Sequence, residues 1–392
     1  MGDQRIGLVL TGGGARAAYQ VGALRALAEL APRGPLPFQV VAGISAGAIN
    51  AVALACAAQD FSAAAEALRH TWAQLKPDRI FRTGTLSLAA TGSRWLRDLG
   101  GGGFLGGNSI NYLLDHAPLR ELLGHVLPLA RMRRHLKAGR LRGVAVSATS
   151  YRHGTGVTWY EGSPEIQPWS RTNRSGERAR LTVDHVLASA AIPLFFPPVK
   201  VGDGFFGDGC VRMVYPMSPA IHMGAQRILT ISVRQNPGEA RPAPASDRLP
   251  LSTIAGVLLN AVFLESIDTD LERLERVNRT LALVPPERLA GADVELHQIP
   301  VLALRPSSDL GQLAVDEYHR FPGMLRYLLR GIGVTADNGV ELLSHLAFEP
   351  IYIGRAMELG YRDTMARRDE VRAFLSGEGP VAAAPVAAAR RA

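Results

Sequence analysis

The sequence predicts an α/β protein with a parallel central sheet, followed by a mainly helical C-terminal region. Two strand-loop-helix units follow each other at the N-terminus. In the first, an apolar run at 5–10 leads through a glycine-rich turn into a helical pattern at 17–30. In the second, an apolar run at 38–44 leads into a small-residue helix at 46–58. Consecutive units of this kind form a parallel sheet whose loops gather at the carboxyl ends of its strands.

The rest of the chain extends this plan. In chain order we expect paired strands at 142–151 and 156–161, a short helix at 182–191, a buried strand at 227–233 and an edge strand at 301–304. The segment 236–250 contains four prolines and is the predicted linker. It divides a first domain at 1–235 from a mainly helical region at 251–375, and the Ala- and Pro-rich tail at 376–392 is predicted to be disordered.

Composition narrows the class of protein. Of the 392 residues 47% are hydrophobic, which is enough to bury a large core. Two distant cysteines, Cys56 and Cys210, give no disulfide framework and fit a reducing compartment. We expect no secretory signal, and the uncharged stretch 34–59 is too rich in Ala and Gly for a membrane span. The net charge of +8 favours anionic partners, either nucleic acid or acidic lipid.

The strongest functional motif is Gly43-Ile44-Ser45-Ala46-Gly47. A serine in this pattern, between an apolar strand and an Ala-rich helix, sits on a sharp turn that lifts its hydroxyl out of the sheet. The helix N-terminus adds a positive potential that favours an oxyanion beside Ser45. The motif therefore predicts the nucleophile of a serine acyl hydrolase. The alternative is that Ser45 only caps the helix.

The glycine loop at 12–14 lies between a strand and a helix, so its backbone N–H groups are available to a negative charge. The loop does not match a dinucleotide fingerprint, which requires Gly where Ala17 stands and an acidic residue about 20 positions later. No Gly-Lys-Ser/Thr follows, which excludes a nucleotide P-loop. The remaining interpretation is an oxyanion hole, in which the N–H groups of Gly13 and Gly14 lie beside that of Ala46.

A serine nucleophile needs a base, and the ten histidines and many carboxylates leave the choice open. Asp203 and Asp208 are both flanked by glycines, and Asp208 follows two phenylalanines. Each is also an ordinary turn residue, because Asp-Gly is a common turn dipeptide. Residue pattern alone does not select one of them.

Four motifs, in this order, resemble those of patatin-like phospholipases. They are Gly12-Gly13-Gly14-Ala15-Arg16, the Ser45 pentapeptide, the segment Ala188-Ser189-Ala190-Ala191-Ile192-Pro193-Leu194-Phe195-Phe196-Pro197-Pro198-Val199, and Asp208-Gly209. The resemblance covers residues 5–235 and is that of a bacterial member of the family. It implies a three-layer α/β/α fold with a mostly parallel sheet.

The resemblance also implies the roles of the site residues. Ser45 corresponds to the nucleophile and Asp208 to the proton acceptor of a Ser-Asp dyad without histidine. Gly12, Gly13 and Gly14 correspond to the oxyanion donors. Asp208 is favoured over Asp203 because it precedes Pro216 by eight residues, as the family's aspartate precedes a proline.

The chain departs from the family pattern at a few positions. Ala17 stands where the family prefers Gly, and Cys210 stands where it prefers Gly or Ala. Met213 and Val214 occupy positions often held by Asn. None of these changes removes a catalytic group.

The dyad imposes a physical condition on Asp208. An exposed aspartate, with a pKa of about 3.9, is a poor base toward a serine hydroxyl. Asp208 must therefore lie in a dry, apolar setting that raises its pKa. We expect the phenylalanines at 205–206 and 195–196 to form that setting.

These inferences predict a lipid acyl hydrolase of phospholipase A or esterase type that works through an acyl-enzyme, without a cofactor or metal. Three alternatives remain at this point. One is a Ser-His-Asp esterase with His222, His297, His319 or His345 as base. The second is a lipid acyltransferase on a related site, and the third is a catalytically silent membrane-binding module.

The predicted partner is a lipid or phospholipid substrate and not nucleic acid. We expect a cytoplasmic protein with peripheral contact at an anionic inner membrane. The candidate contact is a basic cluster of Arg131, Arg133, Arg134, His135, Lys137, Arg140 and Arg142. The alternative for this cluster is a solvated face without a partner.

Overall fold

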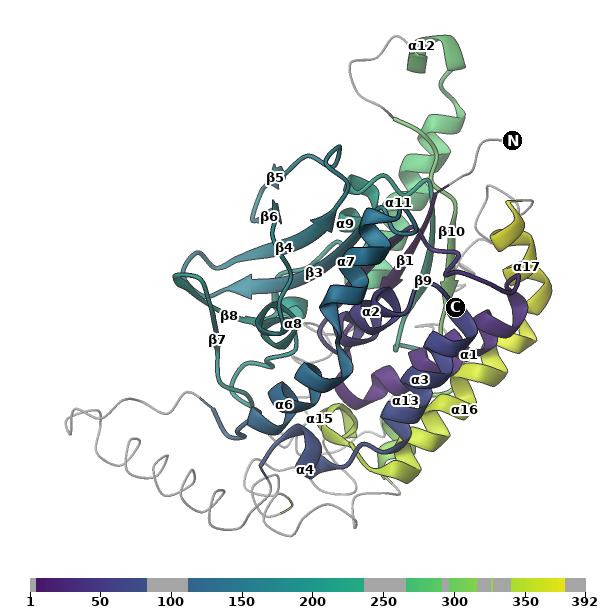
Figure 1. The fold of residues 1–392 in the computed structure, drawn as a ribbon. Helices are drawn as coiled ribbons and strands as arrows, with labels where there is room; N and C mark the ends of the chain where they lie inside the picture. Colours follow the sequence, from purple (N-terminus) through teal and green to yellow (C-terminus); the bar gives the residue numbers. More distant parts are fainter. Residues whose placement is uncertain are drawn as a thin grey trace, which may run out of the picture.

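A mixed but mostly parallel sheet forms the centre of the molecule (Figure 1). The computed structural model describes residues 5–82, 112–235, 266–290, 296–315, 326 and 340–377. Within these residues the strand order is β10-β9-β1-β2-β3-β4-β6-β5, and β8 pairs with both β3 and β7. The strands are β1 (Ile6–Leu10), β2 (Val40–Ile44), β3 (Gly143–Ser150), β4 (Thr155–Gly162), β5 (Trp169–Arg171), β6 (Arg174–Arg178), β7 (Val199–Val201), β8 (Gly204–Asp208), β9 (Arg227–Ile231) and β10 (Val301–Leu304).

The strand pairing confirms the expected plan. β10, β9, β1, β2 and β3 run parallel to one another. The segments predicted as paired strands form the antiparallel pair β3 and β4. β10 joins the edge of the sheet beside β9, as predicted for 301–304. The carboxyl ends of β1 and β2 therefore lie side by side, and the glycine loop and Ser45 follow directly.

Helices cover both faces of the sheet (Figure 1). They are α1 (Ala18–Leu30), α2 (Ala46–Cys56), α3 (Phe61–Ala73), α4 (Pro77–Ile80), α6 (Ala117–Val126), α7 (Leu129–Lys137), α8 (Val183–Ser189), α9 (Ser218–His222), α11 (Ser266–Ala282), α12 (Pro286–Ala290), α13 (Leu310–Val315), α15 (Val340–Leu346), α16 (Pro350–Ala366) and α17 (Arg368–Ser376). Two short 3₁₀ helices, η1 (Gly14–Ala17) and η2 (Gly209–Val211), complete the described elements.

Two hydrophobic cores hold these layers together. Side chains alternate between the faces of a strand, so Leu8 and Leu10 enter the larger core with α1, α2 and α3, and Val9 enters the smaller one. Residues of α9 and α11 such as Ala220 and Leu271 close the smaller core. The three-layer α/β/α fold is thereby confirmed.

The C-terminal helices pack back onto the N-terminal part of the chain. α16 runs along α1 (Figure 1), and the Tyr361 hydroxyl donates to Glu29 over 2.8 Å. The predicted linker at 236–250 and nearly all of the predicted tail lie outside the described residues, so the domain division stays a prediction. No helix in the described ranges is long and apolar enough to cross a membrane.

Two glycines of α16 provide a matched test of this packing. A Cβ at Gly360 would overlap the Tyr19 carbonyl of α1, whereas a Cβ at Gly354 meets nothing within 4 Å. We predict that Gly360→Ala lowers the free energy of unfolding in urea by about 1–3 kcal/mol through overpacking. Gly354→Ala, the control on the same helix, should raise it by about 0.5–1 kcal/mol. Equal effects of the two substitutions would contradict close packing of α16 on α1.

Candidate active site

The turn between β2 and α2 presents Ser45 in a strained conformation. Its backbone has φ 56° and ψ −131°, a region that residues with a side chain rarely adopt. Close packing around the turn requires glycine at the second flanking position, because a Cβ at Gly47 would overlap the Leu10 carbonyl of β1. The Ser45 N–H donates to the Ser189 hydroxyl over 2.9 Å. Strand β1 and helix α8 together hold the Ser45 turn in place.

Strand register brings Asp208 to the same point. β2 pairs with one edge of β3, and this pairing ends where Ile44 lies opposite Ser147. β8 pairs with the same edge of β3 from the next residue on, so that Asp208 lies opposite Ala148. The carboxyl ends of β2 and β8 therefore meet head to head. The Ser45 hydroxyl donates to Asp208 Oδ2 over 2.6 Å, across 163 positions of sequence.

Asp208 is held on every side by hydrogen bonds. Its Oδ1 accepts from the Cys210 N–H at 2.9 Å, while its backbone carbonyl accepts from the Thr149 hydroxyl at 2.7 Å. Its own N–H donates to the Ala191 carbonyl at 2.8 Å. These contacts fix the carboxylate with one oxygen on η2 and the other on Ser45.

Burial changes the acid-base behaviour of this carboxyl. Asp208 is 0% exposed, and the loss of hydration raises its pKa from 3.8 to about 6. The hydrogen bonds from Ser45 and Cys210 act in the opposite direction but do not cancel the effect of burial. The group is therefore ionised at neutral pH and more basic than an exposed aspartate.

The aromatic setting predicted for Asp208 is only partly correct. Phe195 and Phe196 are buried, but Phe205 is 53% exposed on the outer side of β8. Phe206 is half-buried and packs edge-on against Trp159. Successive side chains of a strand point to opposite faces, so Phe205 and Phe206 could not both face inward.

The glycine loop lies against the nucleophile turn. Leu10 pairs with Gly43, which places the loop after β1 beside Ser45. Gly12 touches the site so closely that a Cβ there would lie 2.9 Å from the Ser45 Cβ and overlap the Cys210 sulfur. Gly14 and Ala46 both line the cavity in front of Ser45. Gly13 packs against Val233, next to Gly14.

The predicted donor residues stand at the starts of two helices. The Arg16 N–H of η1 donates to the Gly13 carbonyl and the Ala48 N–H of α2 to the Ser45 carbonyl, so only the N–H groups before them have no partner within the helix. Gly14 begins η1 and Ala46 begins α2. Gly14, Ser45 and Ala46 thus line one cavity. Asp208 bonds to Ser45, Gly12 packs against Ser45, and Gly13 lies between Gly12 and Gly14.

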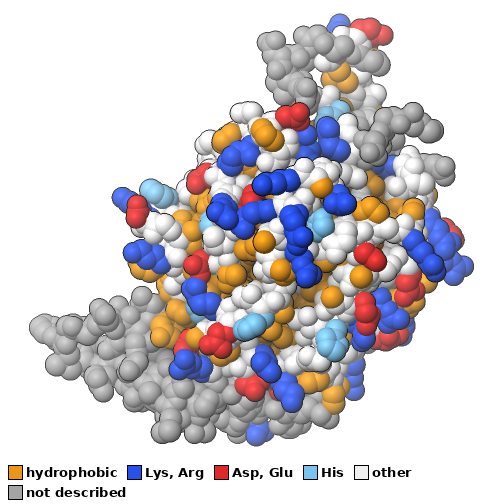
Figure 2. Space-filling view, in the orientation of Figure 1, with side chains coloured by type: hydrophobic (Ala, Val, Ile, Leu, Met, Phe, Trp, Pro, Cys, Tyr) orange, Lys and Arg blue, Asp and Glu red, His pale blue; other side chains and the backbone are white. Residues whose placement is uncertain are grey.

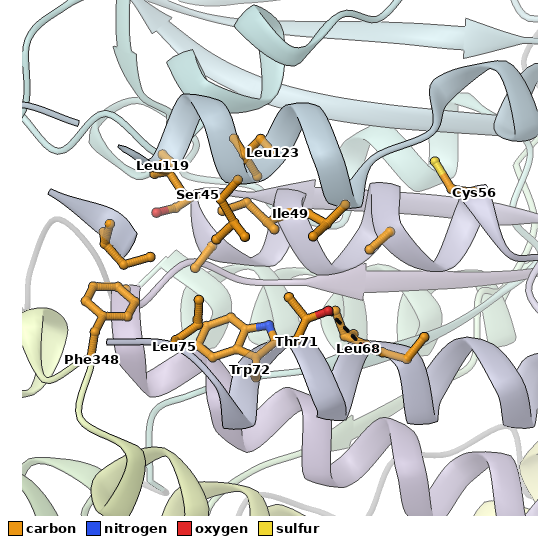
Figure 3. A pocket seen from close by; sticks show the side chains of 18 of the residues that line it. Ser45, Ile49, Cys56, Leu68, Thr71, Trp72, Leu75, Leu119, Leu123 and Phe348 are labelled. Atoms are coloured by element: carbon orange, nitrogen blue, oxygen red, sulfur yellow. Dashed lines mark hydrogen bonds between the residues drawn. The ribbon is translucent and has the colours of Figure 1, made fainter. Parts of the chain in front are cut away.

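A cavity of about 190 Å³ extends from Ser45 along α2 (Figure 3). Ser45 and Cys56 lie toward opposite ends in this view. The lining is almost entirely apolar and comes chiefly from three helices, including Ile49 and Ala53 of α2, Leu68 and Trp72 of α3, and Leu119 and Leu123 of α6.

No sequence pattern pointed to this cavity. The leucines of α6 that line it follow helical spacing, which does not by itself distinguish a cavity wall from a packed core. Phe348, from the C-terminal region, also lines the cavity. No sequence signal connected Phe348 with Ser45.

Comparison with known protein families supports a common origin for this arrangement. The family described as patatin-like phospholipase matches residues 8–221, which contain the glycine loop, Ser45 and Asp208 and make up more than half of the chain. The chain belongs to the patatin-like phospholipase family. Comparison with curated proteins finds no match.

Similar solved structures include a human phospholipase and a protein of Legionella pneumophila. Human GIVD cytosolic phospholipase A2 in complex with methyl gamma-linolenyl fluorophosphonate is 16% identical, with a TM-score of 0.44. The match covers 96% of this chain and 59% of the human chain. VipD from Legionella pneumophila is 13% identical, with a TM-score of 0.36, and the match covers 93% of this chain and 67% of VipD. This patatin-like chain thus spans less than two thirds of the human protein.

Two of the histidines considered as alternative bases, His222 and His297, lie away from Ser45. His222 stacks on Trp169 in contact with the smaller core, and burial lowers its pKa to about 4. His297 is exposed before β10, and His319 lies outside the described residues. His345 places its backbone carbonyl against Gly14. None of the described residues that line the cavity is a histidine.

Two other polar residues, Asp203 and Cys210, lie close to Asp208 in the sequence. Asp203 is exposed in the turn between β7 and β8, so the structure brings Asp208 and not Asp203 to Ser45. Burial raises the pKa of the Cys210 thiol well above its usual range, which keeps it neutral. Within the ranges that the structure describes, no three His, Cys, Asp or Glu side chains are grouped as metal ligands would be.

The raised pKa of Asp208 generates a prediction for the reactivity of Ser45. Only the ionised carboxylate can accept the hydroxyl proton, so the rate of Ser45 labelling by a fluorophosphonate should rise with pH through about 6 and then level off. Asp208→Asn should label slowly, with no step in this range. A wild-type midpoint near 3.8, the ordinary value, would contradict burial as the source of basicity.

Proposed function

We propose that this patatin-like protein is a lipid acyl hydrolase of phospholipase A or esterase type, with Ser45 as nucleophile and Asp208 as proton acceptor. The observation that carries the proposal is the 2.6 Å hydrogen bond from the Ser45 hydroxyl to a buried carboxylate, at one end of an apolar cavity. Membership of the patatin-like phospholipase family supports a lipid as the substrate.

The first half of the reaction acylates the enzyme. Ser45 Oγ attacks the ester carbonyl carbon as Asp208 Oδ2 takes the hydroxyl proton, and the carbonyl electron pair moves onto oxygen. N–H groups of the glycine loop and Ala46 stabilise the resulting oxyanion. When the tetrahedral intermediate collapses, the alcohol leaves with the proton from Asp208 and the acyl group stays on Ser45.

The second half releases the fatty acid. A water molecule attacks the acyl-enzyme carbonyl while Asp208 accepts one of its protons. Collapse of this second intermediate breaks the bond to Ser45 Oγ, which recovers its proton. An aspartate with a pKa of about 6 suits both halves, because it is ionised at neutral pH and still holds a proton well enough to transfer it.

The shape of the cavity supports an acyl chain as the bound group. From Ser45 to Cys56 the rise along α2 is about 16 Å, at about 1.5 Å per residue. A zigzag chain of carbon bonds of about 1.5 Å advances by about 1.25 Å per carbon. The cavity therefore suits an extended chain of roughly 13 carbons, and its apolar lining favours a hydrocarbon over a polar group.

Substitution of the dyad tests the proposed chemistry. We predict that Ser45→Ala lowers hydrolysis of a nitrophenyl butyrate ester at least about 1,000-fold, and that Asp208→Asn lowers it about 100- to 10,000-fold. The exposed Asp203→Asn is the matched control and should keep wild-type kcat/KM. Full activity in either dyad variant would refute the assignment.

A substitution in the cavity tests the acyl-chain assignment. Ala53 lines the cavity on α2, whereas Ala63 is exposed on α3. We predict that Ala53→Phe lowers kcat/KM for nitrophenyl palmitate about tenfold or more, since overpacking costs about 1–3 kcal/mol, and spares nitrophenyl butyrate. Ala63→Phe should leave the ratio of the two rates unchanged. Equal loss on both esters in Ala53→Phe would argue against an acyl chain lying along α2.

A further inference from the structure

Helix α7 and the turn after it carry a row of exposed cations, formed by Arg131, Arg134, Lys137 and Arg140. We name these four residues the α7 row. Residues three apart are neighbours on a helix surface, so the row follows one side of α7. Figure 2 shows Lys and Arg side chains gathered over α7, with hydrophobic side chains among and below them.

The structure divides the basic cluster expected from the sequence into two groups. Arg133 donates to Glu161 Oε1 at 2.9 Å and to the Leu181 carbonyl, and Arg142 donates to Glu165 at 2.7 Å and to the Met223 carbonyl. His135 is buried. These three side chains therefore make contacts within the folded protein and are not free to bind a partner.

The α7 row is the second group, and its charges are not used by the fold. Across the parts of the chain that the structure describes, none of its four members forms an ion pair with a carboxylate. Concentrated unpaired positive charge is unfavourable unless it faces solvent or an anionic partner. The row thus offers complementary charge to an anionic surface.

The row adjoins the substrate cavity. α7 packs on α2, and Arg131 lines the cavity together with Pro128 and Ala57. Pro128 is exposed and Ala57 is half-exposed, so the cavity reaches the surface beside the row. An apolar opening bordered by cations is the pattern of a surface that contacts lipid head groups and the acyl region beneath them.

We propose that the α7 row docks on an anionic phospholipid bilayer and thereby sets the opening of the cavity against the membrane. The identification of the cavity as an acyl-chain site rests on the proposed function, whereas the docking itself does not. Nucleic acid is the less favoured occupant, because α7 exposes no aromatic side chain for base stacking and the neighbouring opening is apolar.

Vesicle binding tests the proposal with catalysis switched off. All proteins carry Ser45→Ala, and their sedimentation with phosphatidylcholine vesicles is compared with that on vesicles that also contain phosphatidylglycerol. The test variant combines Arg134→Gln, Lys137→Gln and Arg140→Gln, and it spares Arg131 because that residue lines the cavity. The control combines Arg362→Gln, Arg368→Gln and Arg372→Gln, three exposed arginines on α16 and α17.

We expect the Ser45→Ala protein to prefer the anionic vesicles. Each Lys or Arg near an anionic bilayer strengthens binding about fivefold, so the test variant should bind about 100-fold more weakly. The control should bind far more tightly than the test variant, although its net charge is the same. With Ser45 restored, the test variant should hydrolyse a soluble nitrophenyl butyrate ester at the wild-type rate.

Three results would overturn the proposal. One is equal vesicle binding by the test and control variants, and another is equal binding to neutral and anionic vesicles. The third is loss of duplex DNA binding in the test variant while vesicle binding persists, which would identify nucleic acid as the occupant. Because binding is measured without a nucleophile, a failure of the proposed chemistry leaves this outcome unaffected.

Discussion

The short hydrogen bond between Ser45 and Asp208 is the interaction on which the rest of the site depends. It exists because β2 and β8, from distant parts of the chain, pair with the same edge of β3. β2 ends opposite Ser147 and β8 ends opposite Ala148, the next residue of β3. A slip of one residue in either register would turn the side chains to the other face of the sheet. The catalytic geometry is therefore a property of strand pairing, and the loops only complete it.

The same arrangement carries two costs that the surroundings offset. Ser45 holds a positive φ, and Asp208 is a carboxyl without contact to solvent. The Ser189 hydroxyl accepts from the Ser45 N–H and donates to the Ser147 carbonyl at 2.5 Å, which ties the strained turn to β3. Such networks allow a strained, dehydrated pair to persist in a folded protein. Ser189, which lies within one of the four sequence motifs, thus fixes the position of Ser45.

Local patterns in the sequence predicted much of the fold, but they did not predict contacts between distant parts of the chain. The nucleophile turn, the paired strands and the edge strand each have a signal within about ten residues, such as alternation or glycine spacing. Asp208 could be distinguished from Asp203 only through the family resemblance, because nothing near either residue records the register of β8 on β3. Phe205 was misassigned for a related reason, since the face of a strand depends on its pairing. The position of Phe348 in the cavity lining and the hydrogen bond from Arg133 to Glu161 depend on tertiary contacts alone.

Burial, opposed by the Ser45 hydrogen bond, makes the Asp208 carboxyl more basic than that of an exposed aspartate. Its carboxyl pKa can be measured directly by carbon NMR of the protein labelled at aspartate, with Asp208→Asn to assign the resonance. The account predicts a pKa of about 6 in the wild type and a higher value in Ser45→Ala, where the hydroxyl that lowers it is absent. A wild-type pKa near 3.8, unchanged by Ser45→Ala, would contradict it.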